Sequence, residues 1–208
     1  MTELMIAVPR GTLFAGSLDL LDGLGLDTEA VRSNERKLLF LEAGIVTMRP
    51  SDVPTYVEAG AADIGITGKD VLMEQSEREV HELADLGFGH CRMVFATAAG
   101  EDRAAETLRR LGVMRVATKY PRVAANHFRR TGRQAEIVEV KGSVELAPLT
   151  GLVEGIVDLT ATGTTLRENG LTIREEIAVC TARLIANPVA HRLKARSIDA
   201  LLEQIDAL

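Results

Sequence analysis

The stretch IVDLTATGTTLRENG, residues 156–170, shows within a few residues the alternation that predicts the fold. An apolar run ends on Asp158, a loop of small and hydroxyl-bearing residues follows, and a helix-like segment ends at Gly170. A buried strand, a short loop and a helix form the repeating unit of α/β proteins. The stretch therefore predicts an α/β fold with one carboxylate near the end of a strand.

The same alternation extends along the chain. Short apolar runs typical of buried parallel strands occupy residues 4–8, 44–48, 63–66, 92–96, 115–118, 136–140, 155–159 and 178–185. Helices are expected to begin at Ser51 and at Ser197, and another is expected across residues 101–112. The last helix places its apolar residues on one face: Ile198, Leu201, Leu202, Ile205 and Leu208. No low-complexity linker interrupts the pattern, which suggests one three-strand unit before about residue 89 and another across 90–170.

Composition excludes several classes of protein. The chain of 208 residues has a formal net charge of −6 and 3% aromatic residues, which argues against nucleic-acid binding. No apolar run approaches the length of about 20 residues that a membrane span needs, and the start lacks the pattern of a signal peptide. The two cysteines, Cys91 and Cys180, lie far apart in the sequence and have no CxxC partner. These features favour a cytoplasmic protein without a structural metal.

The loop after Asp158 has two interpretations. Backbone N–H groups at a helix start bind phosphate, Thr162, Thr164 and Thr165 add hydroxyl groups, and Gly163 permits close approach. The loop matches neither GxxxxGK[ST] nor GxGxxG, and taken alone it is equally compatible with a plain turn. Upstream, Asp158 and Glu145 are carboxylates suited to sugar hydroxyls or to Mg²⁺.

Several longer segments resemble the ATP phosphoribosyltransferase family. The segment at 139–171, EVKGSVELAPLTGLVEGIVDLTATGTTLRENGL, is similar to the signature of that family. AVPRGTL near the start, RPSDVPTYVEAGAADIGITGKDVL at 49–72 and RVATKYP at 115–121 agree with it in the expected order.

The resemblance implies a two-lobed α/β fold similar to type II periplasmic binding proteins, with the active site in the interlobe cleft. Residues 1–89 with about 172–208 would form the first lobe. Residues 90–171 would form the second lobe and carry the loop that binds phosphoribosyl pyrophosphate (PRPP).

Members of this family transfer the phosphoribosyl group of PRPP to N1 of ATP, with Mg²⁺ present, and release pyrophosphate in the first step of histidine biosynthesis. The chain resembles the short form of the family, which lacks a C-terminal regulatory domain. This form works with a regulatory subunit similar to histidyl-tRNA synthetase, so a homodimer within a hetero-oligomer is expected.

The resemblance also implies roles for individual residues. PRPP would be bound by Asp158, Glu145 and the loop residues Thr160, Ala161, Thr162, Gly163, Thr164 and Thr165. Arg49 and Arg36 would be catalytic, because arginines stabilise the charge that develops on the departing pyrophosphate. Weaker candidates for ATP or pyrophosphate are Arg10, Gly11, Lys69 and Lys119, and no direct protein ligand of the metal is expected.

The chain departs from the family pattern in two places. It has Pro9-Arg10-Gly11-Thr12 where the family usually has Pro-Lys-Gly-Arg, so a second cation is missing there. It has Glu154 where the family often has Asp, so no functional role of that family position is assigned to Glu154. Glu154 is interpreted as part of a solvated helix face.

The sequence leaves two other functions open. A non-enzymatic solute-binding protein would share the two-lobed fold, and fold alone does not decide between the two. A purine or pyrimidine salvage phosphoribosyltransferase would have two adjacent acids before the Thr-Gly loop, whereas this chain has Asp158-Leu159.

Overall fold

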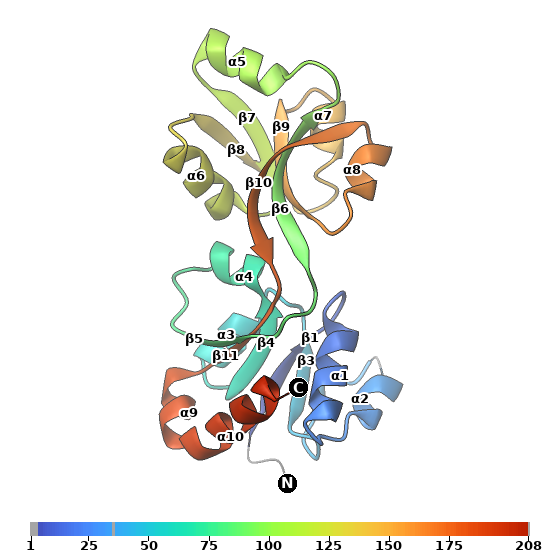
Figure 1. Ribbon diagram of the computed structural model, residues 1–208, viewed down its shortest axis with the longest axis vertical. Helices are drawn as coiled ribbons and strands as arrows, with labels where there is room; N and C mark the ends of the chain where they lie inside the picture. Colours follow the sequence, from blue (N-terminus) through green and yellow to red (C-terminus); the bar gives the residue numbers. More distant parts are fainter. Residues whose placement is uncertain (1–3, 35, 208) are drawn as a thin grey trace. The chain divides into compact units, whose positions relative to one another are not determined.

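The computed structural model describes residues 4–34 and 36–207, and the chain divides into two units, each built on its own sheet (Figure 1). Unit 1 comprises Met1–Gly89 and Thr181–Leu208, and unit 2 comprises His90–Cys180. The sequence led us to expect the chain to leave the second lobe near residue 172. In the structure, Leu171–Cys180 is instead a strand of unit 2, because it pairs along its length with Cys91–Ala98.

Unit 1 contains a six-stranded sheet in the order β2-β3-β1-β4-β11-β5. Its strands are β1 (Ile6–Pro9), β2 (Leu39–Phe40), β3 (Ile45–Met48), β4 (Ile64–Gly68), β5 (His81–Asp85) and β11 (Ala182–Ala186). Its helices are α1 (Phe14–Gly23), α2 (Glu29–Ser33), α3 (Val53–Glu58), α4 (Lys69–Glu74), α9 (Pro188–Leu193) and α10 (Ala195–Asp206). Strands β3, β1 and β4 are parallel, whereas β2 and β11 run antiparallel to their neighbours.

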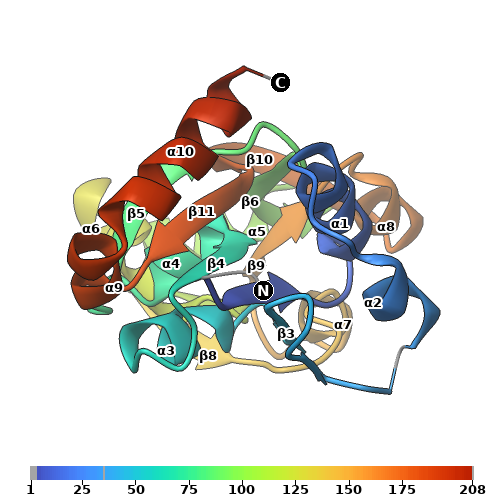
Figure 2. The ribbon, with the colours of Figure 1, turned by 90° about the horizontal axis from the view of Figure 1, so that it is seen from below.

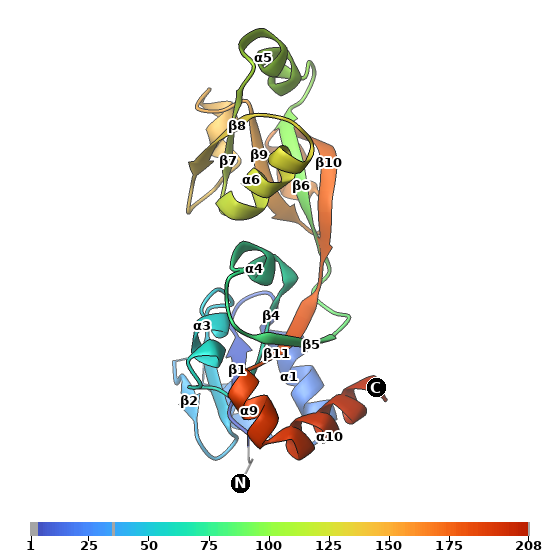
Figure 3. The same cartoon turned by 90° about the vertical axis from the view of Figure 1, so that its left-hand side faces the viewer.

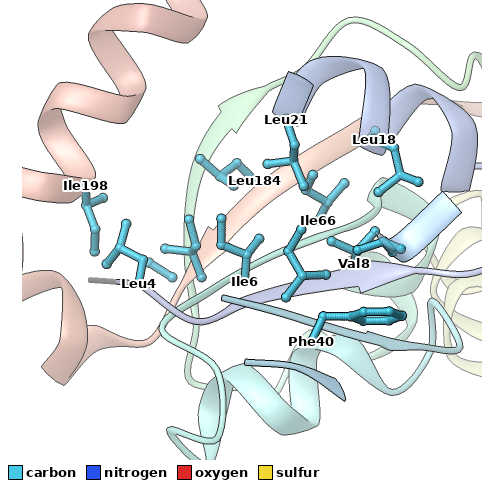
Figure 4. Close-up of a cluster of buried hydrophobic side chains, with 14 residues drawn as sticks. Leu4, Ile6, Val8, Leu18, Leu21, Phe40, Ile66, Leu184 and Ile198 are labelled. Atoms are coloured by element: carbon cyan, nitrogen blue, oxygen red, sulfur yellow. The ribbon is translucent and has the colours of Figure 1, made fainter. Parts of the chain in front are cut away.

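Successive side chains of the central strand β1 in unit 1 point to opposite faces of the sheet, and each face packs against its own apolar layer. Ile6 and Val8 of β1 belong to a core with Leu18 of α1 and Ile198 of α10 (Figure 4). Ala7 between them faces the opposite side, where it packs with residues of α3. Helices α1 and α10 therefore cover one face of the sheet and α3 the other (Figure 2).

Unit 2 contains a five-stranded sheet in the order β10-β6-β9-β7-β8. Its strands are β6 (Cys91–Ala98), β7 (Met114–Thr118), β8 (Ala135–Glu139), β9 (Gly155–Thr160) and β10 (Leu171–Cys180). Its helices are α5 (Arg103–Leu111), α6 (Pro121–Arg130), α7 (Leu146–Leu149) and α8 (Thr164–Glu168). Strands β8, β7 and β9 are parallel, and β6 runs antiparallel to both β9 and β10.

The structure corrects two of the expected helix starts. Asp52, not Ser51, precedes α3, because the Asp52 N–H closes a turn on the Arg49 carbonyl and Ser51 lies inside that turn. Helix α10 begins at Ala195, before Ser197, because the Lys194 carbonyl already accepts the Ser197 N–H.

Two further expectations concern the end of the chain and its strands. Leu208, expected on the apolar face of the last helix, lies outside the described residues. The expected strand at 178–185 is two strands, the end of β10 and most of β11, with Thr181 between them. Among the described residues, no helix is long and apolar enough to cross a membrane.

Candidate functional site

The parallel strands of unit 2 bring several predicted residues to one edge of the sheet. In the β7–β9 ladder Thr118 is opposite Val157, so the next residues, Lys119 and Asp158, lie at the same level. Glu145 follows β8 and immediately precedes α7. The carboxyl ends of parallel neighbours thus collect a lysine and two carboxylates in one region, as expected for an α/β ligand site.

Asp158 is the buried charge of this edge. The residue is only 8% exposed, and its Oδ1 accepts a hydrogen bond from the Leu159 N–H at 2.9 Å. Burial raises the pKa of Asp158 above its ordinary value, and the neighbouring Glu145 carboxylate raises it further. The Leu159 N–H and the Lys119 ammonium act on the same pKa in the opposite direction. A carboxylate that is buried but little hydrogen-bonded is suited to accept donors from a ligand.

The loop after β9 is a turn held by hydrogen bonds from its backbone to threonine hydroxyl groups. The Gly163 N–H donates to Thr160 Oγ1 at 2.8 Å, which holds the turn at the end of the strand. Gly163 has φ of +75°, a left-handed conformation that favours glycine. The Oγ1 atoms of Thr162 and Thr164 lie 2.9 Å apart and share a hydrogen bond. Ala161, Thr162, Thr164 and Thr165 are exposed to solvent.

Arg167 completes the loop and was not among the residues predicted from the sequence. Its guanidinium donates through Nη1 to the Thr162 carbonyl and through Nη2 to Thr164 Oγ1, both at 3.0 Å. Arg167 follows Thr164 by three residues on α8, a spacing that brings side chains together on one helix face. That spacing is the signal from which the contact could have been predicted. The loop therefore carries a fixed positive charge as well as hydroxyl and N–H donors.

A second group of predicted residues lies in unit 1, around a hollow of about 420 Å³ lined by Arg10, Thr47, Arg49, Asp52 and Tyr56 among others. Arg10 is held in place there: Nε donates to Thr47 Oγ1 at 3.1 Å and Nη2 donates to the Lys37 carbonyl at 2.9 Å. Arg49 is exposed, and its guanidinium has no hydrogen-bond or ion-pair partner among residues 4–34 and 36–207. Gly11 follows Arg10 with φ of +86°.

Lys69 and Arg36 differ from Arg10 and Arg49, because neither lines this hollow. Lys69 Nζ lies 2.6 Å from Glu82 Oε2, and this ion pair joins α4 to β5. Arg36 is exposed, and its backbone N–H donates to Asn34 Oδ1 at 3.2 Å. The structure thus brings Arg10 and Arg49 together and leaves the other two cations apart from them.

Glu154 is not on a solvated helix face, contrary to the interpretation from sequence. It lies between α7 and β9, where its carboxylate accepts the Arg115 N–H at 2.6 Å and the Arg115 guanidinium at 2.6 Å. These hydrogen bonds hold the pKa of Glu154 below its ordinary value despite the opposing effect of burial. Glu154 therefore stabilises the start of β9. Within the described parts of the chain, no group of three or more metal-ligating side chains is present.

Comparisons with known proteins identify the family of the chain. A sequence model of the HisG family, described as ATP phosphoribosyltransferase, matches residues 49–207. A Rubrobacter xylanophilus protein named ATP phosphoribosyltransferase is 53% identical, over 99% of this chain and 96% of that protein. A protein of the same name from Desulfitobacterium hafniense is 45% identical, with the same coverage of 99% and 96%.

Solved structures show the same relationship. A chain of the ATP phosphoribosyl transferase (HisG:HisZ) complex from Thermotoga maritima superimposes with a TM-score of 0.81 at 36% identity, covering 98% of this chain and 97% of that one. The periplasmic aliphatic sulphonate binding protein SsuA from Escherichia coli gives a TM-score of 0.62 at 13% identity, covering 97% of this chain and 70% of that one. The second similarity confirms the expected fold, which resembles that of two-lobed periplasmic binding proteins. The family match and the relatives together show that the chain belongs to the HisG family of ATP phosphoribosyltransferases.

Proposed function

We propose that the chain transfers the 5-phosphoribosyl group of PRPP to N1 of ATP, giving N1-(5-phosphoribosyl)-ATP and pyrophosphate in histidine biosynthesis. Membership of the family supports this reaction. The observation that carries it is the buried Asp158 next to the Thr160–Thr165 turn. Arg167 holds this turn through hydrogen bonds to Thr162 and Thr164, a contact called the Arg167 clamp below. The carboxylate is suited to accept hydrogen bonds from sugar hydroxyls, and the donor-rich turn that follows it is suited to a phosphate group. Together they suit a ligand that carries both groups side by side.

The turn after β9 is proposed to hold the 5′-phosphate of PRPP. Its donors are the backbone N–H groups at the start of α8 and the hydroxyl groups of Thr162, Thr164 and Thr165. Arg167 keeps the turn in shape and places its positive charge beside it. The ribose hydroxyls would then donate to Asp158, with Glu145 and Lys119 close to the same ring.

The chemistry needs stabilisation of a leaving group more than it needs a base. N1 of adenine attacks C1 of the ribose with its own lone pair, and the bond from C1 to the pyrophosphate oxygen breaks. Negative charge develops on that oxygen, and a positioned guanidinium stabilises it. Arg49 is the first candidate because its guanidinium is not engaged by any of the residues that the structure describes. Arg36 is the second, and the partly engaged Arg10 is a weaker one.

Mg²⁺ is proposed to enter with the substrates. It prefers oxygen ligands and is often held by one or two carboxylates together with substrate phosphates. Glu145 and Asp158 are the carboxylates of the site, and the cation is proposed to be carried mainly by PRPP and ATP. The bound ion would neutralise the charge of the polyphosphates.

A regulatory subunit similar to histidyl-tRNA synthetase is the proposed partner. The support is the similar chain from Thermotoga maritima, whose structure was solved as a HisG:HisZ complex. We also propose a homodimer within that hetero-oligomer and a cytoplasmic location, in keeping with a biosynthetic enzyme that uses ATP.

The direct test mixes the purified protein with ATP, PRPP and Mg²⁺ and follows phosphoribosyl-ATP by ultraviolet absorbance. We expect product that depends on all three components and that increases or changes its histidine sensitivity when the synthetase-like subunit is added. Asp158→Asn serves as the matched variant, because it keeps the shape of the side chain and removes its charge. Absence of product with and without the partner subunit would overturn the proposal, and tight binding of an amino acid or sulfonate instead would favour a solute-binding function.

A further inference from the structure

The two cysteines are far apart in the sequence but directly opposite each other in the structure. Strands β6 and β10 lie side by side (Figure 3). In their antiparallel ladder Cys91 is the register partner of Cys180, and the pairs Arg92–Val179 and Met93–Ala178 follow. Opposed residues of an antiparallel pair point to the same face of the sheet. Both cysteines are in the thiol form.

The backbone spacing of such a pair suits a disulfide. Opposed residues in antiparallel strands have Cα atoms about 4.5 to 5.5 Å apart, depending on their hydrogen bonding. Disulfides in proteins have Cα separations of about 4.4 to 6.8 Å. The ladder therefore holds Cys91 and Cys180 at a distance that a disulfide spans without separating the strands.

The two thiols differ in their access to solvent. Cys180 is 1% exposed, whereas Cys91 is only half-buried. Reaction with a small oxidant requires an accessible sulfur, so Cys91 is placed to react first. Cys180, opposite it and protected, is placed to react only with the sulfur of Cys91.

We propose that Cys91 and Cys180 form a reversible disulfide whose oxidant is a low-molecular-weight disulfide such as oxidised glutathione. The Cys91 thiolate attacks one sulfur of the oxidant, forms a mixed disulfide and releases one small thiol. The Cys180 thiolate then attacks the Cys91 sulfur, forms the intramolecular bond and releases the second small thiol. The protein loses two electrons and two protons, and the oxidant is reduced to two thiols.

The bond would join the two places where the chain passes between the units. Unit 2 begins at His90, next to Cys91, and ends at Cys180, next to Thr181 of unit 1. A disulfide here closes residues 91–180, all of unit 2 except His90, into a covalent loop. In reducing compartments disulfides are usually transient and redox-sensing, and the proposed bond would be of this kind. The inference is independent of the proposed function.

The experiment treats the purified full chain with oxidised glutathione, alkylates the remaining thiols under denaturing conditions and measures intact mass. For the wild-type chain we expect a product lighter by two hydrogen atoms, without alkyl groups, that dithiothreitol converts back to a chain alkylated twice. Peptide mapping should show one linked pair that contains Cys91 and Cys180.

Two matched variants test the order of the steps. Cys180→Ser should accumulate one stable glutathione adduct on Cys91, since no thiol remains to displace it. Cys91→Ser should acquire little adduct, because Cys180 is buried; circular dichroism checks that both variants are folded. Stable adducts on the wild-type chain, disulfides between chains, or two thiols that remain alkylatable would each overturn the proposal.

Discussion

The two units each contain a strand that leads through a glycine into a helix, and the turns differ in the charge at the helix start. In unit 1, β4 leads through Gly68 into α4, and the Asp70 carboxylate packs directly against that glycine. In unit 2, β9 leads through Gly163 into α8, whose first turn has two threonines and no acid. A helix start attracts anions. At the start of α4 the Asp70 carboxylate already lies in this position, whereas the start of α8 has no acid and is expected to accept an anionic ligand.

The cations of the two turns differ in the same way. Lys69 is paired with Glu82 at 2.6 Å, which removes its charge from the reach of a ligand. Arg167 donates to a carbonyl and a hydroxyl, both uncharged, and none of the described carboxylates forms an ion pair with it. Two turns that look alike in sequence, GITGKD and TATGTT, are thus expected to differ in function. We therefore expect phosphate binding at a glycine turn to depend on the groups that already lie at the start of the following helix.

The largest effect is expected from Arg49, the cation of unit 1 that has no partner among the described residues. Arg49→Ala should lower turnover by about a hundredfold, the usual loss for one donor to a transition state. Arg109→Ala, which removes an exposed arginine at the end of α5, is the control and should keep normal turnover. Steady-state kinetics without the partner subunit make the measurement. Near-normal turnover of Arg49→Ala would remove this residue from the mechanism.

The next effect is expected from Asp158. Asp158→Asn should lower kcat/KM for PRPP by roughly ten- to a hundredfold, because hydrogen bonds to charged groups contribute about 1.5–3 kcal/mol. The variant should be no less stable than the wild type at neutral pH in thermal unfolding, since burial disfavours the ionised form of Asp158. A loss of stability together with activity would indicate a structural role for this carboxylate instead.

The same residue predicts a dependence on pH. The pKa of Asp158 is raised in the folded chain, so its ionised form is lost at higher pH than for an ordinary aspartate. PRPP binding that needs the ionised form should therefore weaken as the pH falls through this raised pKa, and recover above it. The KM for PRPP measured against pH checks this. Asp158→Asn should not show this acidic limb, and an identical limb in both proteins would assign it to another group.

A smaller effect is expected from the glycine of the unit 2 turn. Gly163→Ala puts a side chain at φ of +75° and a Cβ 3.1 Å from Arg167 Nη1, so the clamp on the loop must shift. The left-handed conformation costs about 1–2 kcal/mol, which corresponds to roughly a tenfold increase in the KM for PRPP if the loop is displaced. Gly170→Ala is the matched control, because Gly170 has φ of +64° and open space around it. Equal KM values in the two variants would contradict the phosphate role of the turn.

Much of the architecture could be predicted from the sequence, because buried parallel strands are apolar on both faces. The strand, loop and helix at residues 155–168 follow the expected pattern and are confirmed as β9 and α8. Strand β5 and most of β10 were missed for a physical reason. Both lie at edges of their sheets and have polar sequences, HELAD and LTIREEIAVC, because an edge strand is partly exposed to water.

The details of the candidate site were less predictable, because they depend on contacts between distant segments. The ion pair of Lys69 with Glu82 requires α4 and β5 to be neighbours, and the pairing of Glu154 with Arg115 requires β7 beside β9. Neither contact has a local signal in the sequence. The Arg167 clamp is local and could have been predicted from its spacing to Thr164.

The smallest effect is expected from Lys69. Its substitution tests most directly whether the glycine turn of unit 1, unlike that of unit 2, is closed to phosphate. Lys69→Ala should change the KM for ATP and for PRPP by less than about twofold, because Glu82 already holds the ammonium group. The free energy of unfolding should fall by no more than about 1 kcal/mol, since both side chains are about one-third exposed and solvent screens the pair. Lys119→Ala is the matched variant in unit 2, where an exposed lysine lies near Asp158 and should affect PRPP binding more strongly. If Lys69→Ala instead raised either KM by tenfold or more, the lysine would have to exchange Glu82 for substrate. The turn in unit 1 would then be a second anion site, and the Asp70 carboxylate would not be a reliable sign of a turn closed to phosphate.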